Sequence, residues 1–310
     1  DCAAYDKLGV TTAKECYENA SKYARLAEAQ GFTPMSKDDW YKGFNSSNDA
    51  WMFAISISSD DMNDDTNWSW KNFTSFMSAE TEFGVGSYLY GSTRQIDRQL
   101  YEKMNSADWR KNTWIAPTDA GQESGTSKYK TILSKADFKK LSAYTGLKFK
   151  PGNDNMADYT VGAAVDIPLM RVEEMYFIDA EATAHASGLE AGKRILEDFM
   201  NNYRCTVTTD NPKPFTSVAS DLWNFTNEII REKRIEFWGE GLIYFDYKRL
   251  KMGFTTNYDG TNHPKAYQFN FSNGFVAPRM NFCFSNSETQ YNSAIINNPD
   301  PSGVESAASK

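Results

Sequence analysis

Hydrophobic residues recur every three or four positions near the start of the chain, and this spacing predicts an amphipathic helix. Thr12 and Glu15 have the spacing of a capping box at its start, and Gly31 would end it. A second, short helix is predicted from Ser36, and the apolar, partly β-branched run at 51–57 is predicted to be a strand. The apolar positions of the first helix are Cys16, Tyr17, Ala20, Tyr23, Ala24 and Ala27.

The longest helical pattern lies between Met170 and Tyr203. It predicts two helices separated by Gly188, and the pair covers 34 residues, the period of a tetratricopeptide helix hairpin. A further helical block is predicted from a cap at Asp221 towards Leu250. We therefore expect a mainly α fold of tetratricopeptide-like hairpins, an α-α superhelix, over about residues 12–57, 96–115 and 170–252.

Polar and glycine-rich segments separate these helices, at about residues 58–95, 116–165 and 253–310. Helical periodicity is weak in them, so we expect an irregular, loop-rich part with a few short strands. The first segment is acidic, contains two tryptophans, and continues into a glycine-punctuated aromatic run. Loops of this length are usually either functional or mobile.

The charge balance changes the list of partners that the chain is expected to have. The formal net charge is −8 and the isoelectric point is about 5.0, so neither nucleic acid nor an anionic membrane surface is expected as a partner. No run approaches the roughly 18 apolar residues that a membrane-spanning helix needs. Aromatic residues nevertheless make up 15% of this hydrophilic chain, which predicts that some of them face solvent or a ligand.

Residues that hold metals or perform redox chemistry are scarce. His185 and His263 are the two histidines, too few for a three-histidine metal site. The four cysteines include no C-x-x-C pair, so a zinc ribbon and a dithiol redox centre are excluded, while two disulfides are permitted but not required. No metal or cofactor is expected. The cysteines are Cys2, Cys16, Cys205 and Cys283.

An acidic run begins in the way that a calcium-binding loop begins. Asp61, Asn63 and Asp65 alternate as calcium ligands do, but the sixth position is Thr66 instead of Gly and the twelfth is Asn72 instead of Glu. A solvated acidic loop is therefore the favoured interpretation. The chain also lacks G-x-S-x-G, H-E-x-x-H and P-loop motifs, so the sequence does not support nucleophilic or metal-assisted catalysis.

A cluster of charged residues follows Asp221. Glu232, Glu236 and Glu240 lie at four-residue steps, so they share a helix face, with Arg231 and Arg234 beside them. Two carboxylates across a sugar would suit a glycosidase. The favoured interpretation is a structural ion-pair network, because arginines match the carboxylates and large apolar residues surround them. We expect it to include Arg171, Glu174, Glu232, Arg234, Glu236 and Glu240.

Aromatic residues in the first loop-rich segment are the candidate ligand-binding residues. Aromatic residues two positions apart in an extended segment project to the same side and offer flat apolar platforms. Flanking amides would bind the hydroxyls of a sugar ring. The alternative is that these rings attach the loop to the core, as buried Trp and Tyr often do. The candidates are Trp68, Trp70, Asn67, Asn72, Tyr88 and Tyr90.

Two long segments carry a family resemblance, IPLMRVEEMYFIDAEATAHASG at 167–188 and IIREKRIEFWGEGLIYFDYKRL at 229–250. The first resembles one motif, and the second the charged helix pair, of the SusD/RagB family of outer-membrane nutrient-binding lipoproteins. LYEKMNSADWRKN resembles the family's D-x-R segment through Asp108 and Arg110, and SNSETQYNSAIINNP is similar to its closing stretch. Ile243 stands where the family has an arginine. The family positions matched in the helix pair are Glu232, Arg234, Glu236, Phe237, Glu240, Gly241, Phe245, Asp246 and Arg249.

The resemblance implies tetratricopeptide-like hairpins supporting a loop-rich half, and a non-catalytic glycan-binding protein on the outer-membrane surface. There it would bind an oligo- or polysaccharide and pass it to a SusC-like TonB-dependent transporter. Because such proteins are longer, residues 1–310 are expected to be the C-terminal portion of one SusD-like domain, with a lipid anchor outside this chain. The alternatives are a helical scaffold for protein interaction that binds no sugar and, less favoured, a glycoside hydrolase.

Overall fold

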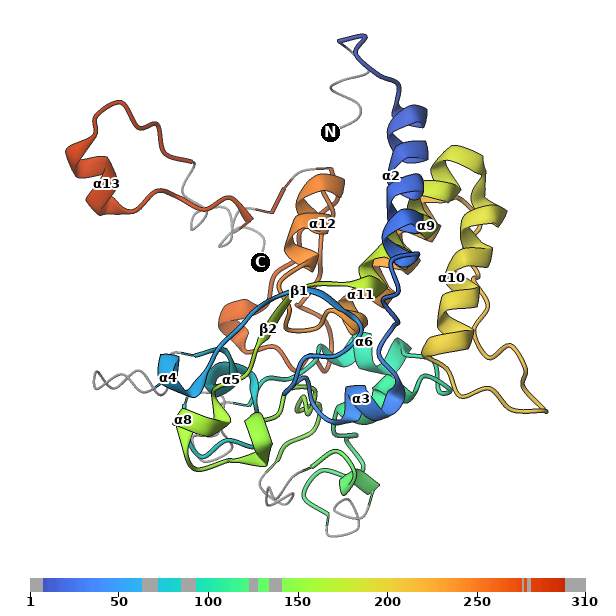
Figure 1. Cartoon of the computed structure of the whole chain (residues 1–310). Coiled ribbons are helices and arrows are strands. Elements are labelled where there is room, and N and C mark those ends of the chain that lie inside the picture. The colour runs from blue at the N-terminus through green and yellow to red at the C-terminus, as the bar shows by residue number, and fades with distance from the viewer. Residues whose placement is uncertain are drawn as a thin grey trace. The chain divides into compact units, whose positions relative to one another are not determined.

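The computed structural model describes residues 8–62, 72–84, 93–122, 128–133, 141–274, 276–277 and 280–298 (Figure 1). These residues belong to two compact units. The first comprises Asp1–Ile96 and Leu100–Glu240, and the second comprises Asp97–Gln99 and Gly241–Lys310. No helix in the described part of the chain combines the length and the apolar character that crossing a membrane requires.

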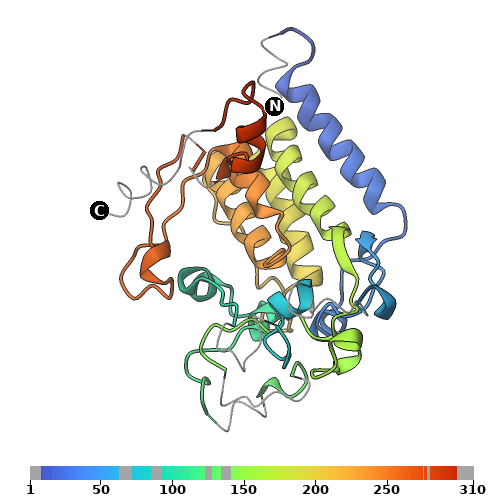
Figure 2. The same cartoon turned by 90° about the vertical axis from the view of Figure 1, so that its left-hand side faces the viewer.

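The first unit contains a layer of four long helices, which confirms the expected mainly α, tetratricopeptide-like fold. The helices are α2 (Ala13–Glu28), α9 (Val172–Ser187), α10 (Leu189–Tyr203) and α11 (Leu222–Glu236). Gly188 joins α9 and α10 as a one-residue connection with a φ of 108°, so the two helices form a hairpin. α2 packs along the other side of α9, and α11 packs on both helices of the hairpin (Figures 1 and 2).

The capping box that the sequence predicts at the start of α2 is present. Thr12 Oγ1 accepts a hydrogen bond from the backbone N–H of Glu15 at 3.1 Å, and Glu15 Oε2 accepts one from the backbone N–H of Thr12 at 2.9 Å. Small residues such as Ser21 and Ala24 form the buried face of α2. Tyr23 was expected on this face, but its side chain is 63% exposed because it lies on the opposite side of the helix.

Close approach between α9 and α10 depends on the absence of a side chain at Gly192. A Cβ atom at Gly192 would lie 2.5 Å from both the carbonyl oxygen of Ala180 and the Cβ of Ala184. Alanines on the buried face of α9 therefore allow contact between the two backbones. This contact explains why the alanine-rich stretch of the sequence belongs to a hairpin.

Residues 12–57 do not form the hairpin that was expected there. A short helix, α3 (Lys37–Tyr41), begins after a Ser36 cap as predicted, but α2 uses its small-residue face to pack on α9. The predicted strand is β1 (Trp51–Ile55), which pairs antiparallel with β2 (Ile167–Arg171). The helix expected from Met170 therefore begins only at Val172, since the preceding residues belong to β2.

Short elements and loops complete the first unit. They include α4 (Ser59–Met62), α5 (Phe73–Met77), the 3-10 helices η2 (Trp109–Thr113) and η4 (Gly152–Asp154), and α8 (Tyr159–Gly162). α6 (Arg98–Lys103) begins in the second unit and ends in the first. An aromatic core holds α3, β1 and η2 together, and its largest members are Trp40, Phe44, Trp51, Trp109 and Phe149.

The second unit is held together by contacts to three consecutive residues, Asp97–Gln99. Asp97 Oδ2 lies 2.9 Å from both the hydroxyl of Tyr258 and Nε2 of His263. The Arg98 side chain donates to the carbonyl oxygen of Gly260 at 2.9 Å.

Along the chain, the helical block expected from Asp221 to Leu250 is interrupted after α11. Its second part is α12 (Ile243–Leu250), and η5 (Lys265–Tyr267) and α13 (Asn286–Tyr291) follow.

Adding a side chain at Gly192 tests the close packing of the hairpin. We expect Gly192→Leu to lower the free energy of unfolding by about 1–3 kcal/mol, because the new side chain must push α9 and α10 apart. Thermal denaturation followed by circular dichroism measures this loss. Arg194→Leu, at an exposed position of the same helix, is the control and should leave the melting temperature nearly unchanged. Equal melting temperatures for the two variants would contradict the contact.

Candidate functional site

A buried carboxylate, Glu236, is bound by three arginines in the first unit. Glu236 Oε1 accepts hydrogen bonds from Arg171 Nη1 and Arg204 Nη2, each at 3.0 Å. Its Oε2 accepts from Arg110 Nη1 and Arg204 Nε, each at 2.7 Å. All four side chains are at most 1% exposed. This cluster is the centre of a larger network of charges.

Further carboxylates balance the three arginines. Arg110 also pairs with Asp108 at 2.6 Å and with Glu232 at 3.0 Å. Glu173 pairs at 3.0 Å with both Arg171 and Arg204. Because each guanidinium faces at least two carboxylates, the charges offset one another without water. The central charge network, as the term is used below, consists of Asp108, Arg110, Lys148, Arg171, Glu173, Arg204, Glu232, Glu236 and Glu240.

Lys148 connects this network to the end of α11. Its ammonium donates to the backbone carbonyls of Glu236 at 2.7 Å and Trp238 at 3.0 Å, and to Glu240 Oε1 at 2.5 Å. A cation at this position is favourable because the last carbonyls of a helix carry partial negative charge. The ammonium also lies 4.8 Å from the ring centre of Trp40. Burial lowers the pKa of Lys148 to about 8.

The electrostatics of the carboxylates follow from their surroundings. Burial opposes ionisation of Glu236, but Arg204, Arg171 and Arg110 outweigh it and hold the pKa of Glu236 well below its ordinary value. At Glu232 burial dominates over the attraction of Arg110, so the pKa of Glu232 is raised. Every carboxylate oxygen of Glu236 is already bound and inaccessible. This arrangement holds segments together and leaves Glu236 no route to a sugar.

The network includes four of the six residues that the sequence predicted for it, namely Arg171, Glu232, Glu236 and Glu240. Arg234 forms no ion pair with any described residue, and Glu174 pairs with Lys233 at 4.0 Å, outside the network. The sequence reasoning missed the remaining partners. Arg110 and Asp108 carried a signal, since they match the D-x-R segment of the family resemblance. Arg204, Glu173 and Lys148 carried none, because helical spacing does not connect them to α11.

Most of the predicted ligand-binding residues lie outside the described part of the chain. This holds for Asn67, Trp68, Trp70, Tyr88 and Tyr90. Asn72 is described, and it is the N-cap of α5. Its Oδ1 accepts a hydrogen bond from the backbone N–H of Ser75 at 2.8 Å. One function of Asn72 is therefore to begin this short helix.

Five of the six candidates fall in two aromatic segments, residues 63–71 and 85–92, and the described residues that border these segments meet at α5. Asn72 follows the first segment and begins α5. Gly84 precedes the second segment and lies so close to α5 that a Cβ there would be 2.3 Å from Cβ of Ser75. Arg94, just after the second segment, donates from Nε to the carbonyl oxygen of Phe76 in α5 at 3.2 Å. Three borders of the two segments are thus in contact with one short helix, α5.

Two further contacts attach the same region to α8 and to the residues just before it. The backbone N–H of Glu82 donates to the carbonyl oxygen of Met156 at 2.8 Å. Phe83 packs so closely on Gly162 that a Cβ on this glycine would lie 2.9 Å from the ring. α4, which precedes the first aromatic segment, also packs on α8. The α5–α8 region therefore supports the ends of both segments.

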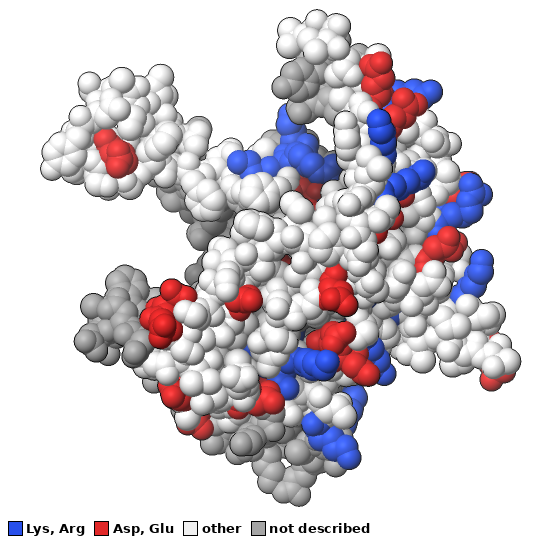
Figure 3. Space-filling view, viewed as in Figure 1, with Lys and Arg blue, Asp and Glu red and all other residues white. Residues whose placement is uncertain are grey.

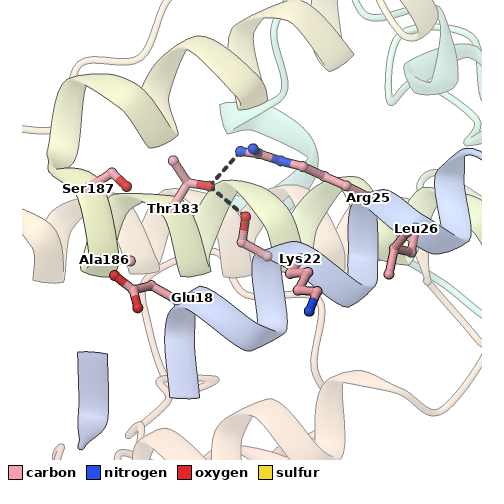
Figure 4. Close-up of a pocket in the computed structure, with 8 residues that line it drawn as sticks. Glu18, Lys22, Arg25, Leu26, Thr183, Ala186 and Ser187 are labelled. Carbon is pink, nitrogen blue, oxygen red and sulfur yellow. Dashed lines mark hydrogen bonds between the residues drawn. The ribbon is translucent and has the colours of Figure 1, made fainter. Parts of the chain in front are cut away.

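A surface pocket of about 390 Å³ lies between α2 and α9 (Figure 4). Ser21 and Arg25 both contact Thr183 Oγ1, at 3.2 and 3.1 Å, and Arg25 also pairs with Asp179 at 2.9 Å. These bonds connect the two helices beneath the pocket. Basic and acidic side chains are interspersed over the helices around it (Figure 3), so no patch of one sign is formed. The pocket is lined by Glu18, Ser21, Lys22, Arg25, Leu26, Thr183, Ala186 and Ser187.

The described residues include free thiols and no cluster of metal ligands. No group of three or more His, Cys, Asp or Glu side chains among them is arranged to hold a metal ion. Cys16 and Cys205 are free thiols, and burial raises the pKa of Cys205 to about 12, which keeps it protonated and unreactive. Of the acidic run that resembles a calcium loop, Asp61 caps α4 by accepting from the backbone N–H of Ser58 at 2.7 Å. Asn63 and Asp65 lie outside the described residues.

The chain belongs to the SusD family, whose model matches residues 37–299. The match includes the central charge network and both aromatic segments. No curated protein sequence matches the chain.

Solved structures with this fold come from Bacteroides and Parabacteroides. A SusD-like carbohydrate binding protein from Bacteroides vulgatus ATCC 8482 is 20% identical with a TM-score of 0.60, over 91% of this chain and 56% of that protein. Surface glycan-binding protein A from Bacteroides thetaiotaomicron, in complex with laminarihexaose, is 16% identical with a TM-score of 0.55, over 92% and 60%. A SusD superfamily protein from Parabacteroides distasonis ATCC 8503 is 16% identical with a TM-score of 0.58, over 93% and 58%. At these identities the likeness shows the fold, and the chain spans less than two thirds of each structure.

Removing the central carboxylate tests the structural role of the network. We expect Glu236→Ala to lower the free energy of unfolding by about 3–5 kcal/mol, because three buried guanidiniums lose a shared partner. Chemical denaturation measures this change. Glu18→Ala is the control, and we expect a change below about 1 kcal/mol because its ion pair with Lys14 is long, at 3.7 Å, and exposed. An unchanged denaturation midpoint for Glu236→Ala would contradict the structural role.

Glu28, near the end of α2, predicts that the stability of the folded protein depends on pH. Burial and the nearby carboxylate of Asp179 raise the pKa of Glu28 from 4.5 to about 7. A carboxyl with a raised pKa in the folded state favours folding below pH 4.5, and this contribution is lost as the pH rises through 7. Glu28→Gln should therefore be more stable than the unmodified protein at pH 8, with a smaller difference at pH 5.

Urea denaturation at the two pH values measures this difference. Glu18→Gln, on the exposed face of the same helix, is the control for loss of a carboxylate from α2. If Glu28→Gln and the unmodified protein differ equally at pH 5 and pH 8, Glu28 does not titrate in this range.

Proposed function

We propose that the chain is a non-catalytic, glycan-binding component of a polysaccharide uptake complex at the cell surface. Its ligand is an oligo- or polysaccharide, and its protein partner is a SusC-like TonB-dependent transporter of the outer membrane. Membership of the SusD family supports this function. The names of two similar structures, a carbohydrate binding protein and a surface glycan-binding protein with laminarihexaose, point in the same direction.

The proposed binding site depends on one observation, that residues bordering both aromatic segments contact α5. Two segments whose borders contact the same short helix are well placed to contribute to one surface. Aromatic rings offer flat apolar faces to the C–H groups of a sugar, while amides bind its hydroxyls. The proposed ligand-binding residues are Trp68, Trp70, Asn67, Asn72, Tyr88 and Tyr90.

The central charge network supports this function by fixing the scaffold. Binding sites are most selective when rigid elements hold the segments that contact the ligand. The network connects α9, α10, α11 and η2, and it lies in the same unit as α5 and α8.

Attachment to the membrane would need only a lipid anchor outside this chain, so no part of the described structure has to enter a bilayer.

Gel electrophoresis in the presence of soluble polysaccharides tests the proposed function. We expect the protein to migrate more slowly in at least one gel of a broad glycan panel that includes laminarin. Trp68→Ala and Trp70→Ala should each weaken this retardation by about 2- to 10-fold, the value of one aromatic stacking contact. Release of new reducing ends should not occur.

Trp223→Ala provides a matched control, because Trp223 lies on α11 and its side chain is 43% exposed. This variant should keep full retardation. Absence of retardation across the panel would contradict glycan binding and favour a scaffold that contacts only proteins. Release of reducing ends would contradict the non-catalytic role.

A further inference from the structure

The guanidinium of Arg94 lies over an exposed aromatic ring beside the proposed binding site. The central carbon of its guanidinium is 3.8 Å from the ring centre of Phe76, and its Nε donates to the backbone carbonyl of Phe76 at 3.2 Å. The Phe76 side chain remains 49% exposed although the guanidinium covers part of it. The two side chains form one composite surface, apolar on the ring and cationic at the guanidinium.

Arg94 differs from the arginines of the central charge network in its partners. Arg110, Arg171 and Arg204 each face two or more carboxylates. No carboxylate in the described part of the chain pairs with Arg94, and partial burial lowers its pKa. The stacking contact and the bond from Nε fix the orientation of the guanidinium. Its two terminal nitrogens therefore remain as a preorganised pair of donors.

The charge and planar geometry of the guanidinium indicate which ligand group Arg94 would bind. A planar guanidinium forms two parallel hydrogen bonds with a carboxylate, and such charge-assisted bonds are about twice as strong as neutral ones. Sugars present a carboxylate next to an apolar ring face when they are uronic acids. Phe76 and Arg94 offer the complementary pair of groups, an aromatic face with an adjacent cation.

We propose that Arg94 binds the carboxylate of a uronic acid residue and that Phe76 contacts the face of the same sugar. This inference rests on the proposed function, and it names an acidic glycan as the ligand class. Phe76 lies on α5, and Arg94 follows the second aromatic segment, so both belong to the region where the borders of the two segments meet. The position would extend the proposed site to a sugar with a charged substituent.

The net charge of the protein constrains this binding. A chain of net charge −8 repels a polyanion at long range, so attraction must come from the local cation. Charges separated by more than about 8 Å are largely screened at physiological ionic strength, which limits the repulsion to near neighbours. Binding of an acidic glycan should therefore persist at about 0.15 M salt and depend on Arg94.

A purely structural role for Arg94 is the competing explanation. In that case the guanidinium only covers Phe76, and its loss would lower stability without changing the choice of ligand. A comparison between charged and neutral forms of one glycan separates the two roles, since stability affects both forms equally.

The experiment uses gel electrophoresis with polygalacturonate and with the same polymer after full methyl esterification, which removes the charge but keeps the backbone. We expect the unmodified protein to be retarded at least 10-fold more strongly by polygalacturonate. Arg94→Gln should abolish this preference, and Arg94→Lys should keep only part of it because an ammonium cannot form the two parallel bonds. Phe76→Leu should weaken retardation by both forms.

Arg194→Gln, which removes an exposed arginine of α10, is the control for a change in net charge and should behave as the unmodified protein does. Equal retardation by both polymers, or a preference that persists in Arg94→Gln, would overturn the inference. Retardation by neutral glycans alone would also overturn it, while leaving the proposed function intact. Absence of retardation by every glycan would overturn both.

Discussion

The fold of the first unit depends on the neutralisation of Glu236 by three arginines. A carboxylate and three guanidiniums that are fully buried would each cost several kcal/mol if they were left without partners. Arg110, Arg171 and Arg204 come from η2, from the end of β2 and from the end of α10, while Glu236 closes α11. These four segments must therefore meet in one arrangement. Apolar contacts alone would tolerate small shifts, whereas the directional hydrogen bonds of these pairs, two of them from Arg204 to Glu236, would not.

This constraint explains why a chain with little regular structure outside α2 and α9–α11 forms an ordered unit. Residue Met35, which precedes α3, donates its backbone N–H to Glu173 at 2.8 Å and accepts from Arg204 at 3.1 Å. The network thus also positions a loop. A helical layer fixed by charges, with irregular segments attached to it, allows loops to differ without disturbing the helices.

Local sequence signals predicted the helices well. The Thr12–Glu15 capping box, the Ser36 and Asp221 caps and the Gly188 connection all act between neighbouring residues, so a single stretch of sequence is sufficient to identify them. Glu232 and Glu236 were assigned to an ion-pair network for the same reason, since four-residue spacing places them on one helix face. Predictions that depended on a residue far away in the sequence were less accurate. The proposed sugar-binding residues remain predictions, because five of the six lie outside the described residues.

The sequence by itself determined where α2, α3 and α11 begin, that Gly188 separates α9 from α10, and that Glu232 and Glu236 share a helix face. Tertiary structure decided that Arg110 and Arg204 bind Glu236 beside Arg171, because Arg110 lies 126 residues from Glu236 and Arg204 lies 32 residues away. It likewise decided that α2 packs on α9 instead of α3, and that Arg94 stacks on Phe76. Helical periodicity indicates which face of a helix a residue occupies, but it does not indicate which distant segment covers that face. The aromatic and charged residues of this chain acquire their partners only when β1 pairs with β2 and the helices close around the charges.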